Sequence, residues 1–579
     1  MVFDGFPRQF RYKKNSMIAR VTRRPRKKRI VILGGGFGGV YVAVYLGRLF
    51  SSRELKEIEI VLVNRENYIV FQPLLPEVIS GSVELNHVIT PIRRMAPRAQ
   101  LYTREVESID PIARRVTLSP GIRPTSVSLQ YDHLVIALGT RLNYSKIPGM
   151  REHASPFKYL SDALYLRNQL VRALEEAETE PDLEIRRRLL TFVVVGGGFS
   201  GIECIAEMND FLRDAVGAYH NISEKDLRLI LLQRGNRILP EVTESLATFA
   251  QELLVKRGVE VRLGADLKAV SARAVIVKDN ATGKTETIAT RTTVATVPAG
   301  PHPLLTSLPF PQDKGRITVH QDTQVSDWPN VWAIGDCAAI KQVDGQISPP
   351  TAQHALRQAK TCAENIVASF RGTPRKIFKF TGLGKLGSLG RRSAVAEVFG
   401  IRLKGLLAWM LWRGIYVTKF PGLDGQLRLI ADWILDAFLP RDITQLRLFH
   451  EENVHREHFE EGETIFSNGD TGDKVYFIVK GEATVERDGT SLATLRAREV
   501  FGEAALLTRQ PRNATLRAAS ALDVVVVSRD AFQELLAHLP GVRQAMQEIT
   551  KARSVRGEAL PGENVLGKPG VSSAINLEV

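Results

Sequence analysis

The chain has 579 residues and a formal net charge of +15, and 44% of its residues are hydrophobic. This length exceeds one ordinary core and predicts about three or four domains. Three cysteines in so long a chain exclude a small disulfide scaffold. Because Cys204, Cys337 and Cys362 form no CxxC pair, we expect a reducing compartment.

The positive charge is concentrated in two segments. Residues 1–29 hold eleven Lys or Arg against Asp4 alone, and residues 371–447 hold fourteen basic side chains against five acidic ones. The rest of the chain is therefore slightly acidic. Separate basic segments suit an anionic surface, either a membrane or a nucleic acid, and say nothing about the fold.

Two segments about 160 residues apart have the same pattern. Residues 29–46 and 191–208 each predict a buried strand, a glycine turn and a helix. A further apolar strand follows each helix, at residues 58–63 and 227–232. This is the βαβ pattern of a parallel sheet, and it predicts an α/β protein with two Rossmann-like dinucleotide-binding domains.

The glycines of both turns have the GxGxxG spacing, which is a weak signal alone and a strong one between a strand and a helix. The first glycine makes the tight turn, the second lets a pyrophosphate approach the backbone, and the third packs helix against strand. The six glycines are Gly34, Gly36, Gly39, Gly196, Gly198 and Gly201. Two such turns predict two bound dinucleotides.

An acidic residue is expected where the second strand of each unit ends, and an amide stands there instead. Asn64 can still accept a hydrogen bond from an adenosine ribose, so FAD binding remains expected. Gln233 removes the carboxylate that would repel a 2′-phosphate, and Arg234 and Arg237 stand nearby. We therefore expect NADPH to be accepted at least as well as NADH.

At this point the chain resembles the two-dinucleotide flavoprotein reductases, in which an NAD(P)H fold interrupts an FAD fold. The resemblance implies that Asp336, in the Gly335-Asp336 pair, binds the ribityl and phosphate region of FAD. Residues 137–139 match the family's ATG turn except for Leu138, and Gly139 keeps the turn glycine. No metal site is predicted.

Within that family, three segments resemble type II NADH dehydrogenases, the single-subunit NAD(P)H:quinone oxidoreductases that pump no protons. Residues 71–76 resemble the FxPLLP segment, residues 348–358 the AQxAxQ quinone motif, and residues 438–446 the C-terminal signature. The disulfide reductases and sulfide:quinone oxidoreductases fit less well, because their redox cysteines are missing. The resemblance covers about residues 29–447.

This resemblance implies roles for three side chains. Gln353 would contact the quinone head group beside the flavin, and Gln358 stands one place later than the second glutamine of the motif. Glu203 would lie near the nicotinamide and relay protons. The alternatives are a solvated helix residue for Gln353 and a carboxylate favoured by the helix dipole for Glu203.

A membrane quinone requires contact with the bilayer. Residues 403–420 mix Trp, Tyr, Lys and Arg with apolar bulk, and their longest charge-free run, residues 405–412, is too short to span. Residues 426–439 divide into a charged and an apolar helical face, as in an interfacial helix. A dimer interface is the alternative. The family resemblance implies a peripheral protein on the cytoplasmic face of the inner (plasma) membrane, and a homodimer.

After residue 448 the pattern changes to short strands separated by Gly and Asp, as in a β-roll. Residues 501–518 closely resemble the phosphate-binding cassette of cyclic nucleotide-binding domains. This resemblance implies that the backbone after Gly502 and the Arg512 side chain bind the cyclic phosphate, and that Glu503 accepts from the ribose 2′-hydroxyl. A purely structural module is the alternative. No helix-turn-helix follows, so no nucleic-acid partner is predicted.

The expected order is a basic arm, an FAD domain interrupted by an NAD(P)H domain, a membrane or dimer region, a cyclic nucleotide-binding domain and a tail. The expected bounds are 1–28, 29–154 with 306–370, 155–305, 371–447, 448–550 and 551–579. The hypothesis is an NAD(P)H:quinone oxidoreductase regulated by a cyclic nucleotide, with cAMP expected. The alternatives are a soluble reductase of a small electron-transfer protein and a redox-linked cyclic-nucleotide sensor.

Overall fold

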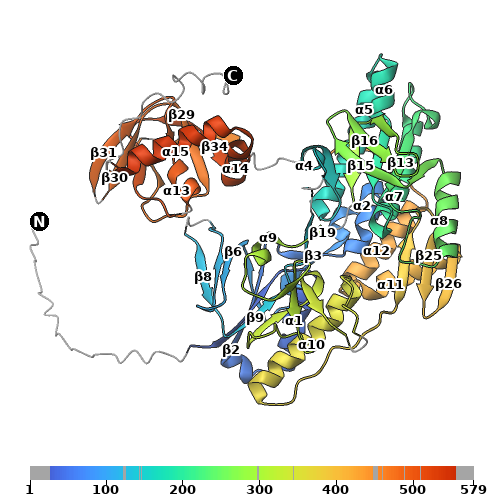
Figure 1. The fold of residues 1–579 in the computed structure, drawn as a ribbon, viewed down its shortest axis with the longest axis horizontal. Helices are drawn as coiled ribbons and strands as arrows, with labels where there is room; N and C mark the ends of the chain where they lie inside the picture. Colours follow the sequence, from blue (N-terminus) through green and yellow to red (C-terminus); the bar gives the residue numbers. More distant parts are fainter. Residues whose placement is uncertain are drawn as a thin grey trace, which may run out of the picture.

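A computed structural model describes residues 26–121, 125–142, 144, 147–296, 299–342, 345–446, 454–459, 461–487, 489–508 and 510–555. The predicted basic arm therefore lies almost wholly outside the described residues, and so does most of the predicted tail. Figure 1 shows the helices and strands in chain order.

The first parallel sheet holds the strand that leads into the first glycine turn. Its order is β22-β9-β1-β2-β5, with every neighbouring pair parallel. The central strand β1 is completely buried from Ile30 to Leu33, as expected of a strand covered on both faces. The strands are β1 (Lys28–Leu33), β2 (Ile58–Asn64), β5 (Gln100–Thr103), β9 (His133–Ile136) and β22 (Val331–Ala333).

The second parallel sheet repeats this arrangement around the second glycine turn. Its order is β11-β18-β12-β13-β14, again with parallel neighbours. Its strands are β11 (Ala154–Pro156), β12 (Thr191–Val195), β13 (Arg228–Gln233), β14 (Val259–Leu263) and β18 (Thr292–Ala295). Because β22 returns to the first sheet after β18, the second unit is inserted in the first. The predicted α/β class with an inserted Rossmann-like unit is confirmed.

Helices pack against both sheets. In the first unit α1 (Phe37–Leu49) packs on α10 (Ala352–Arg371), and α2 (Leu75–Ser80) packs on the helices α5 (Leu160–Thr179) and α7 (Phe199–Ala215). The remaining helices of this part are α3 (Ile92–Met95), α4 (Met150–His153), α6 (Leu183–Leu189), α8 (Glu244–Lys256) and α9 (Pro303–Thr306). The packing of α2 on α7 brings a helix that lies between β2 and β5 of the first sheet against the helix that follows the second glycine turn.

Antiparallel strands extend each unit. One small sheet of the first unit contains β6 (Val106–Asp110), β7 (Arg115–Leu118) and β8 (Val127–Gln130). A sheet of the second unit contains β15 (Ala265–Val270), β16 (Ala274–Asp279) and β17 (Thr285–Ala289). The shorter strands are β3 (Tyr68–Val70), β4 (Ile89–Pro91), β10 (Arg141–Leu142), β19 (Ala299–Gly300), β20 (Gln312–Asp313), β21 (Arg316–Val319) and β23 (Ala338–Ile340).

The segment expected to be helical begins instead with a three-stranded antiparallel sheet. It contains β24 (Gly384–Ser388), β25 (Ala394–Val398) and β26 (Ile401–Gly405), followed by α11 (Leu406–Lys419) and α12 (Leu423–Asp436). Residues 394–398 (AVAEV) and 401–403 (IRL) are short β-branched and apolar runs on either side of Gly400, which is a hairpin signal. Among the described residues, no helix is both long enough and apolar enough to cross a bilayer.

The described residues from 454 onward form a separate unit, which we call the β-roll domain (Figure 1). Its two four-stranded sheets have the orders β27-β34-β29-β32 and β28-β33-β30-β31, all antiparallel. The predicted β-roll is confirmed. Its strands are β27 (Val454–Phe459), β28 (Thr464–Phe466), β29 (Lys474–Lys480), β30 (Ala483–Arg487), β31 (Thr490–Leu495), β32 (Val500–Phe501), β33 (Thr515–Ala518) and β34 (Leu522–Ser528), and its helices are α13 (Glu503–Thr508), α14 (Arg529–His538) and α15 (Pro540–Val555).

Candidate functional site

The first glycine turn joins β1 to α1, and its three glycines have different steric surroundings. Gly34 has a φ of +105°, and a Cβ there would lie 2.3 Å from the carbonyl oxygen of Ala137. A Cβ on Gly39 would lie 1.9 Å from the carbonyl oxygen of Gly34. A Cβ on Gly36 would meet no protein atom within 4 Å, which leaves this backbone open to a ligand.

The second glycine turn, between β12 and α7, repeats the pattern. Gly196 has a φ of +114°, and a Cβ on Gly201 would lie 1.8 Å from the carbonyl oxygen of Gly196. A Cβ on Gly198 would have Glu241 as its nearest neighbour, at 3.5 Å. Both turns therefore combine two glycines that the fold requires with one that leaves the backbone accessible.

The two amides at the ends of β2 and β13 hold equivalent positions. Asn64 Oδ1 accepts a hydrogen bond from the Gly35 amide at 2.9 Å, and Gln233 Oε1 accepts one from the Gly197 amide at 3.0 Å. Each side-chain nitrogen donates to a nearby carbonyl, of Glu66 and of Arg237. These amides fasten the glycine turns, and a ribose would have to share or displace those bonds.

The first glycine turn opens into a cavity of about 540 Å³ that also reaches Gly139 and Asp336. Burial raises the pKa of Asp336, while Lys158 and Arg316 oppose that effect. Among the described residues, the buried Arg104 Nε and His302 Nδ1 atoms have no hydrogen-bond partner, and both residues line this cavity. Two unpartnered polar atoms beside an open glycine turn fit a polar ligand such as a dinucleotide.

The two glutamines of α10 bind backbone next to this cavity. Gln358 is 1% exposed; its Oε1 accepts from the Gly335 amide at 2.8 Å and its Nε2 donates to Ser348 at 2.9 Å. Gln353 accepts from the Leu383 amide at 3.0 Å. Gln358 thus supports the turn that carries Asp336, and Gln353 ties α10 to the segment before β24.

Glu203 lies in the first turns of α7 and is 9% exposed. Its Oε1 accepts a hydrogen bond from the Ser388 amide of β24 at 3.1 Å. Burial raises the pKa of Glu203 to about 8, and the charges of Glu207 and Glu77 add to that rise, while the Ser388 amide and the Trp412 indole oppose it. Glu203 is therefore a neutral acid at neutral pH, able to release a proton.

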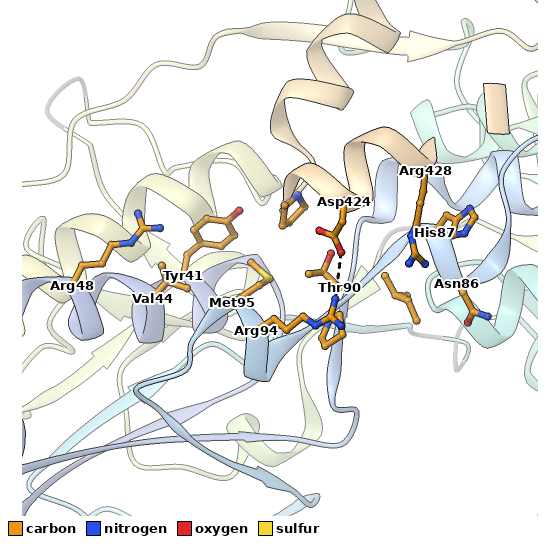
Figure 2. A pocket seen from close by; sticks show the side chains of 15 residues that line it. Tyr41, Val44, Arg48, Asn86, His87, Thr90, Arg94, Met95, Asp424 and Arg428 are labelled. Atoms are coloured by element: carbon orange, nitrogen blue, oxygen red, sulfur yellow. Dashed lines mark hydrogen bonds and ion pairs between the residues drawn. The ribbon is translucent and has the colours of Figure 1, made fainter. Parts of the chain in front are cut away.

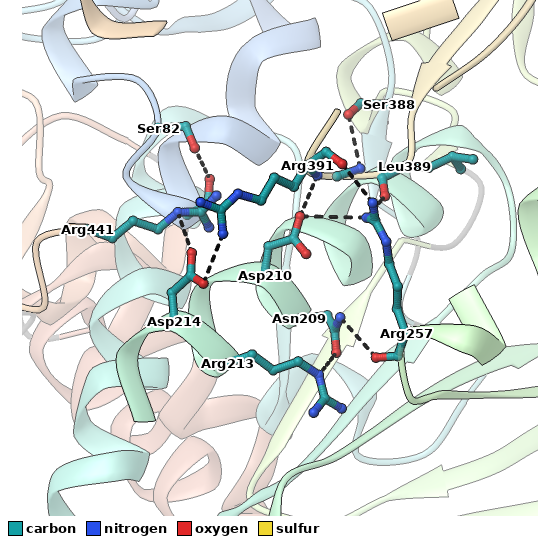
Figure 3. A network of polar contacts seen from close by, with 12 residues as sticks. Ser82, Asn209, Asp210, Arg213, Asp214, Arg257, Ser388, Leu389, Arg391 and Arg441 are labelled. Carbon is teal, nitrogen blue, oxygen red and sulfur yellow. Dashed lines mark hydrogen bonds and ion pairs between the residues drawn. The ribbon is translucent and has the colours of Figure 1, made fainter. Parts of the chain in front are cut away.

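Sequence reasoning missed the rest of an acidic row on α7. Glu203, Glu207, Asp210 and Asp214 are spaced four, three and four residues apart, which places them on one helical face. Burial raises the pKa of Glu207 and of Asp210. This spacing is visible in the sequence and could have predicted an acidic face on the helix. The outer end of the row meets Arg257, Arg391 and Arg441, where Arg441 pairs with Asp214 at 3.3 Å (Figure 3).

The aromatic residues expected to anchor a membrane face mostly inward. Trp412 is 1% exposed and Trp433 is 7% exposed, and the Trp433 indole donates to Glu77 at 2.8 Å. Arg413 stacks between Trp409 and Trp433, with its guanidinium 4.0 and 4.4 Å from the two ring centroids. The exposed apolar side chains of α11 and α12 are aliphatic: Leu406, Leu407, Met410, Leu423, Leu427, Ile430, Ile434 and Leu435.

In the β-roll domain the side chain of Arg512 is turned inward. It is 4% exposed, and it donates to the carbonyl oxygens of Gly502 at 2.6 Å and Lys474 at 2.7 Å. The guanidinium stacks on Phe466, 4.1 Å from the ring centroid, and its Nε has no partner among the described residues. Glu503 is 1% exposed, one residue after Gly502. The three expected ligand residues are therefore adjacent in space.

Two parallel-sheet units, one inserted in the other and each with a sterically required glycine turn, define the class of dinucleotide-binding oxidoreductases. A family model described as pyridine nucleotide-disulphide oxidoreductase matches residues 28–359, more than half of the chain. An NDH2 C-terminal domain model matches residues 383–442 and a cyclic nucleotide-binding domain model matches residues 456–538. The chain belongs to the pyridine nucleotide-disulphide oxidoreductase family, in its type II NADH dehydrogenase branch, and carries a C-terminal cyclic nucleotide-binding domain.

Similar proteins agree with this assignment. The type II NADH:quinone oxidoreductase Ndh of Mycobacterium tuberculosis is 30% identical over 448 residues, 76% of this chain and 94% of that protein. The demethylphylloquinone reductase NdbB of Synechocystis is 31% identical over 70% of this chain and 96% of that protein. The solved structure of NDH2 from Plasmodium falciparum in complex with NADH has the same fold, with a TM-score of 0.67, 21% identity, and coverage of 72% of this chain and 100% of that one.

Proposed function

We propose that this chain is a type II NADH:quinone oxidoreductase that takes hydride from NADH onto FAD and passes the electrons to a quinone. The observation that carries this proposal is the pair of glycine turns, one opening into the cavity that contains Asp336 and the other supporting the helix that carries Glu203. FAD would accept hydride from the nicotinamide and give up electrons at the quinone. The protein would supply binding, orientation and protons.

Each site residue has a part in this scheme. The turns of Gly34, Gly36 and Gly39 would hold the FAD pyrophosphate, with Asn64 and Asp336 at its two ends. The turn of Gly196, Gly198 and Gly201 would hold the NADH pyrophosphate. Quinone reduction also consumes protons, and Glu203 would deliver one from its Oε atoms, because its raised pKa keeps it protonated at neutral pH. Gln353 would present its amide to the quinone.

The nicotinamide donor would include NADPH. Gln233 carries no charge to repel a 2′-phosphate, and its amide is bound to Gly197. The Arg234 side chain is 82% exposed and pairs with Asp266 at 3.5 Å, so its guanidinium can turn toward a phosphate.

The purified protein with FAD should reduce a short-chain quinone with either donor. Arg234→Ala should raise the KM for NADPH about tenfold, the effect of one charge-assisted contact, and leave the KM for NADH unchanged. Arg228→Ala is a matched control, because Arg228 is the first residue of β13, the strand that Arg234 follows, and pairs with Glu260. Turnover only with a ferredoxin-type protein acceptor would contradict the quinone assignment.

We also propose that α11 and α12 bind a membrane surface as a peripheral contact on the cytoplasmic side. Their exposed aliphatic side chains would enter the interface. A groove of about 530 Å³ beside α12 carries Arg48, Arg94 and Arg428, of which Arg94 pairs with Asp424 at 3.3 Å (Figure 2). Cations beside an apolar face suit anionic lipid headgroups. The same two helices, α11 and α12, would also form the contact between the two subunits of a homodimer.

Replacing Ile434 with glutamate should weaken binding to phosphatidylglycerol vesicles about tenfold, because Ile434 is 54% exposed on α12 and its apolar contact would be lost. Vesicle co-sedimentation measures the effect. Ile276→Glu is the matched control, since Ile276 is an exposed isoleucine on β16, away from these helices. Equal loss of vesicle binding in both variants would show that α12 is not the membrane-binding surface.

The β-roll domain would bind a cyclic nucleotide, with cAMP the expected ligand, and regulate turnover. Gly502, Glu503 and Arg512 would contact the ligand. The supporting observation is that the buried Nε of Arg512 has no hydrogen-bond partner in the part of the chain that the structure describes, as expected of a donor that binds an anion. The phosphate would compete with two carbonyl oxygens for the Nη donors of Arg512.

Arg512→Lys should weaken cAMP binding by about tenfold or more, because lysine cannot replace the bidentate contact with a phosphate. Calorimetric titration of the full-length protein measures the affinity. Arg517→Lys is the control, since Arg517 is a half-exposed arginine on β33 that pairs with Glu486 at 3.7 Å. Unchanged cAMP affinity in Arg512→Lys would remove Arg512 from the ligand contact.

A further inference from the structure

The β-roll domain contacts the first unit at the small antiparallel sheet of β6, β7 and β8 (Figure 1). Arg529, the first residue of α14, pairs with Glu107 of β6 through its Nη1 atom at 3.6 Å. The Ser126 amide, one residue before β8, donates to Thr471 Oγ1 at 3.1 Å. Two contacts thus connect the domain to two strands of one sheet.

Both contacts lead to a single loop, residues 470–474, which we call the coupling loop. Thr471 lies in it, and Arg529 donates its side chain to the Gly472 carbonyl and its amide to the Asp473 carbonyl at 2.8 Å. The coupling loop and Arg529 therefore form one hydrogen-bonded unit facing β6 and β8.

The inner side of the coupling loop is packed against Arg512. The Arg512 amide donates to the Asp470 carbonyl, and its guanidinium donates to the Lys474 carbonyl, both at 2.7 Å. A Cβ on Gly472 would lie 2.4 Å from the Ala505 Cβ and 3.3 Å from the Arg512 Cζ. With so little free space, a movement of the Arg512 side chain must move the loop.

The other side of the contact leads to the first dinucleotide cavity. Glu105 and Val106 line this cavity, and Val106 is the first residue of β6. Glu105 pairs with Arg141, a further cavity residue, at 3.2 Å. Glu107 lies two residues after Glu105. A displacement of Glu107 would therefore also displace the start of β6, where Glu105 and Val106 line the cavity.

We propose that the coupling loop and its contacts with Glu107 and Ser126 are the path by which a cyclic nucleotide at Arg512 controls the FAD cavity. This inference rests on the proposed cyclic-nucleotide regulation. A bound phosphate would take the Nη donors of Arg512, the Lys474 carbonyl would lose its donor, and the coupling loop would be released from β6 and β8. Coupling between two sites is reciprocal, so occupancy of the cavity must also change cAMP affinity.

Hydrogen exchange on the full-length protein gives a direct test. Addition of cAMP should increase the exchange rate of the Ser126 amide, because its acceptor Thr471 Oγ1 moves away. We expect an increase of about fivefold, which corresponds to a modest coupling free energy between the two sites. Arg512→Lys should abolish this increase at the same cAMP concentration. Binding of cAMP with no change in exchange at residues 106–110 and 126–130 would overturn the inference.

Turnover gives the second test. Glu107→Gln and Thr471→Val each remove one contact without removing a ligand-binding or catalytic side chain. Because each variant is partly released without cAMP, its basal NADH:quinone turnover should shift toward the value that wild type has with saturating cAMP. The ratio of turnover with cAMP to turnover without it should move to one in both variants. Arg115→Gln, an exposed charge on β7 of the same sheet, is the control and should keep the wild-type ratio.

The outcomes separate the two proposals. If wild type responds to cAMP and both variants respond equally well, the coupling path is wrong and the regulation stands. If wild type binds neither cAMP nor cGMP, or binds without any change in turnover, the proposed regulation is wrong and the coupling path is overturned with it.

Discussion

Replacing Gly39 with alanine should produce a protein that no longer retains FAD. A Cβ at this position would lie 1.9 Å from the Gly34 carbonyl oxygen, and neither backbone segment can yield without separating α1 from β1. That separation would break the turn whose open backbone faces the cavity. The absorbance of bound flavin in the purified protein, relative to protein concentration, measures the loss, which should exceed about tenfold.

Two matched glycine variants make this result specific. Gly201→Ala imposes the same clash in the second turn, at 1.8 Å from the Gly196 carbonyl oxygen, and should leave FAD bound while raising the KM for NADH. Gly217→Ala adds a Cβ that meets nothing within 4 Å and should change neither. Full flavin occupancy in Gly39→Ala would show that the first turn does not hold the cofactor.

Replacing Glu203 with glutamine should lower quinone turnover on the order of 10²-fold at neutral pH, the usual contribution of a positioned acid. The glutamine Oε1 can still accept from the Ser388 amide, so the local geometry should survive and flavin content should not change. Stopped-flow measurement of flavin reduction by NADH and of reoxidation by quinone separates the two half-reactions. The loss should fall on reoxidation.

The pH dependence of turnover supplies an independent signature. Glu203 has a pKa of about 8 in the folded protein, so the protonated form that donates is lost as pH rises through 8. Wild-type turnover should fall there, and the Glu203→Gln profile should be flat. Because the folded pKa is raised, the native state also binds this proton more tightly than the unfolded chain, and the stabilisation present below the unfolded pKa disappears as pH rises through 8. A variant with wild-type turnover and an unchanged alkaline limb would remove Glu203 from proton transfer.

The sequence predicted the parts of the fold that depend on local pattern. Buried strands before glycine turns identified both parallel sheets, because Val and Ile runs beside GxGxxG have few other structural uses. The sheet of β24, β25 and β26 was not predicted, because its three strands are only five residues long each and carry charged residues among their apolar ones. The pairing of α2 with α7 was also out of reach, since it joins segments more than a hundred residues apart.

The candidate site was predictable in its residues and less so in their surroundings. Gln233 was expected to remove the repulsion of a 2′-phosphate, and its Oε1 also accepts a hydrogen bond from the Gly197 amide, which was not predicted. Arg512 was expected to face a phosphate, and it binds two carbonyl groups. Trp412 was expected at a membrane and is buried. Each difference depends on a tertiary contact between residues far apart in the sequence, which a local pattern does not show.

The burial of the three cysteines has a practical consequence. Cys204, Cys337 and Cys362 are each at most 2% exposed, and burial raises the pKa of every one of the three thiols, that of Cys337 to about 11. Because the thiolate is the reactive form of cysteine, these three buried residues should not react with maleimides or thiol-specific spin labels. A cysteine introduced on exposed Arg115 of β7 and another on the β-roll domain would then be the reactive pair, and the distance between two labels could be followed as nucleotides are added to the otherwise native protein.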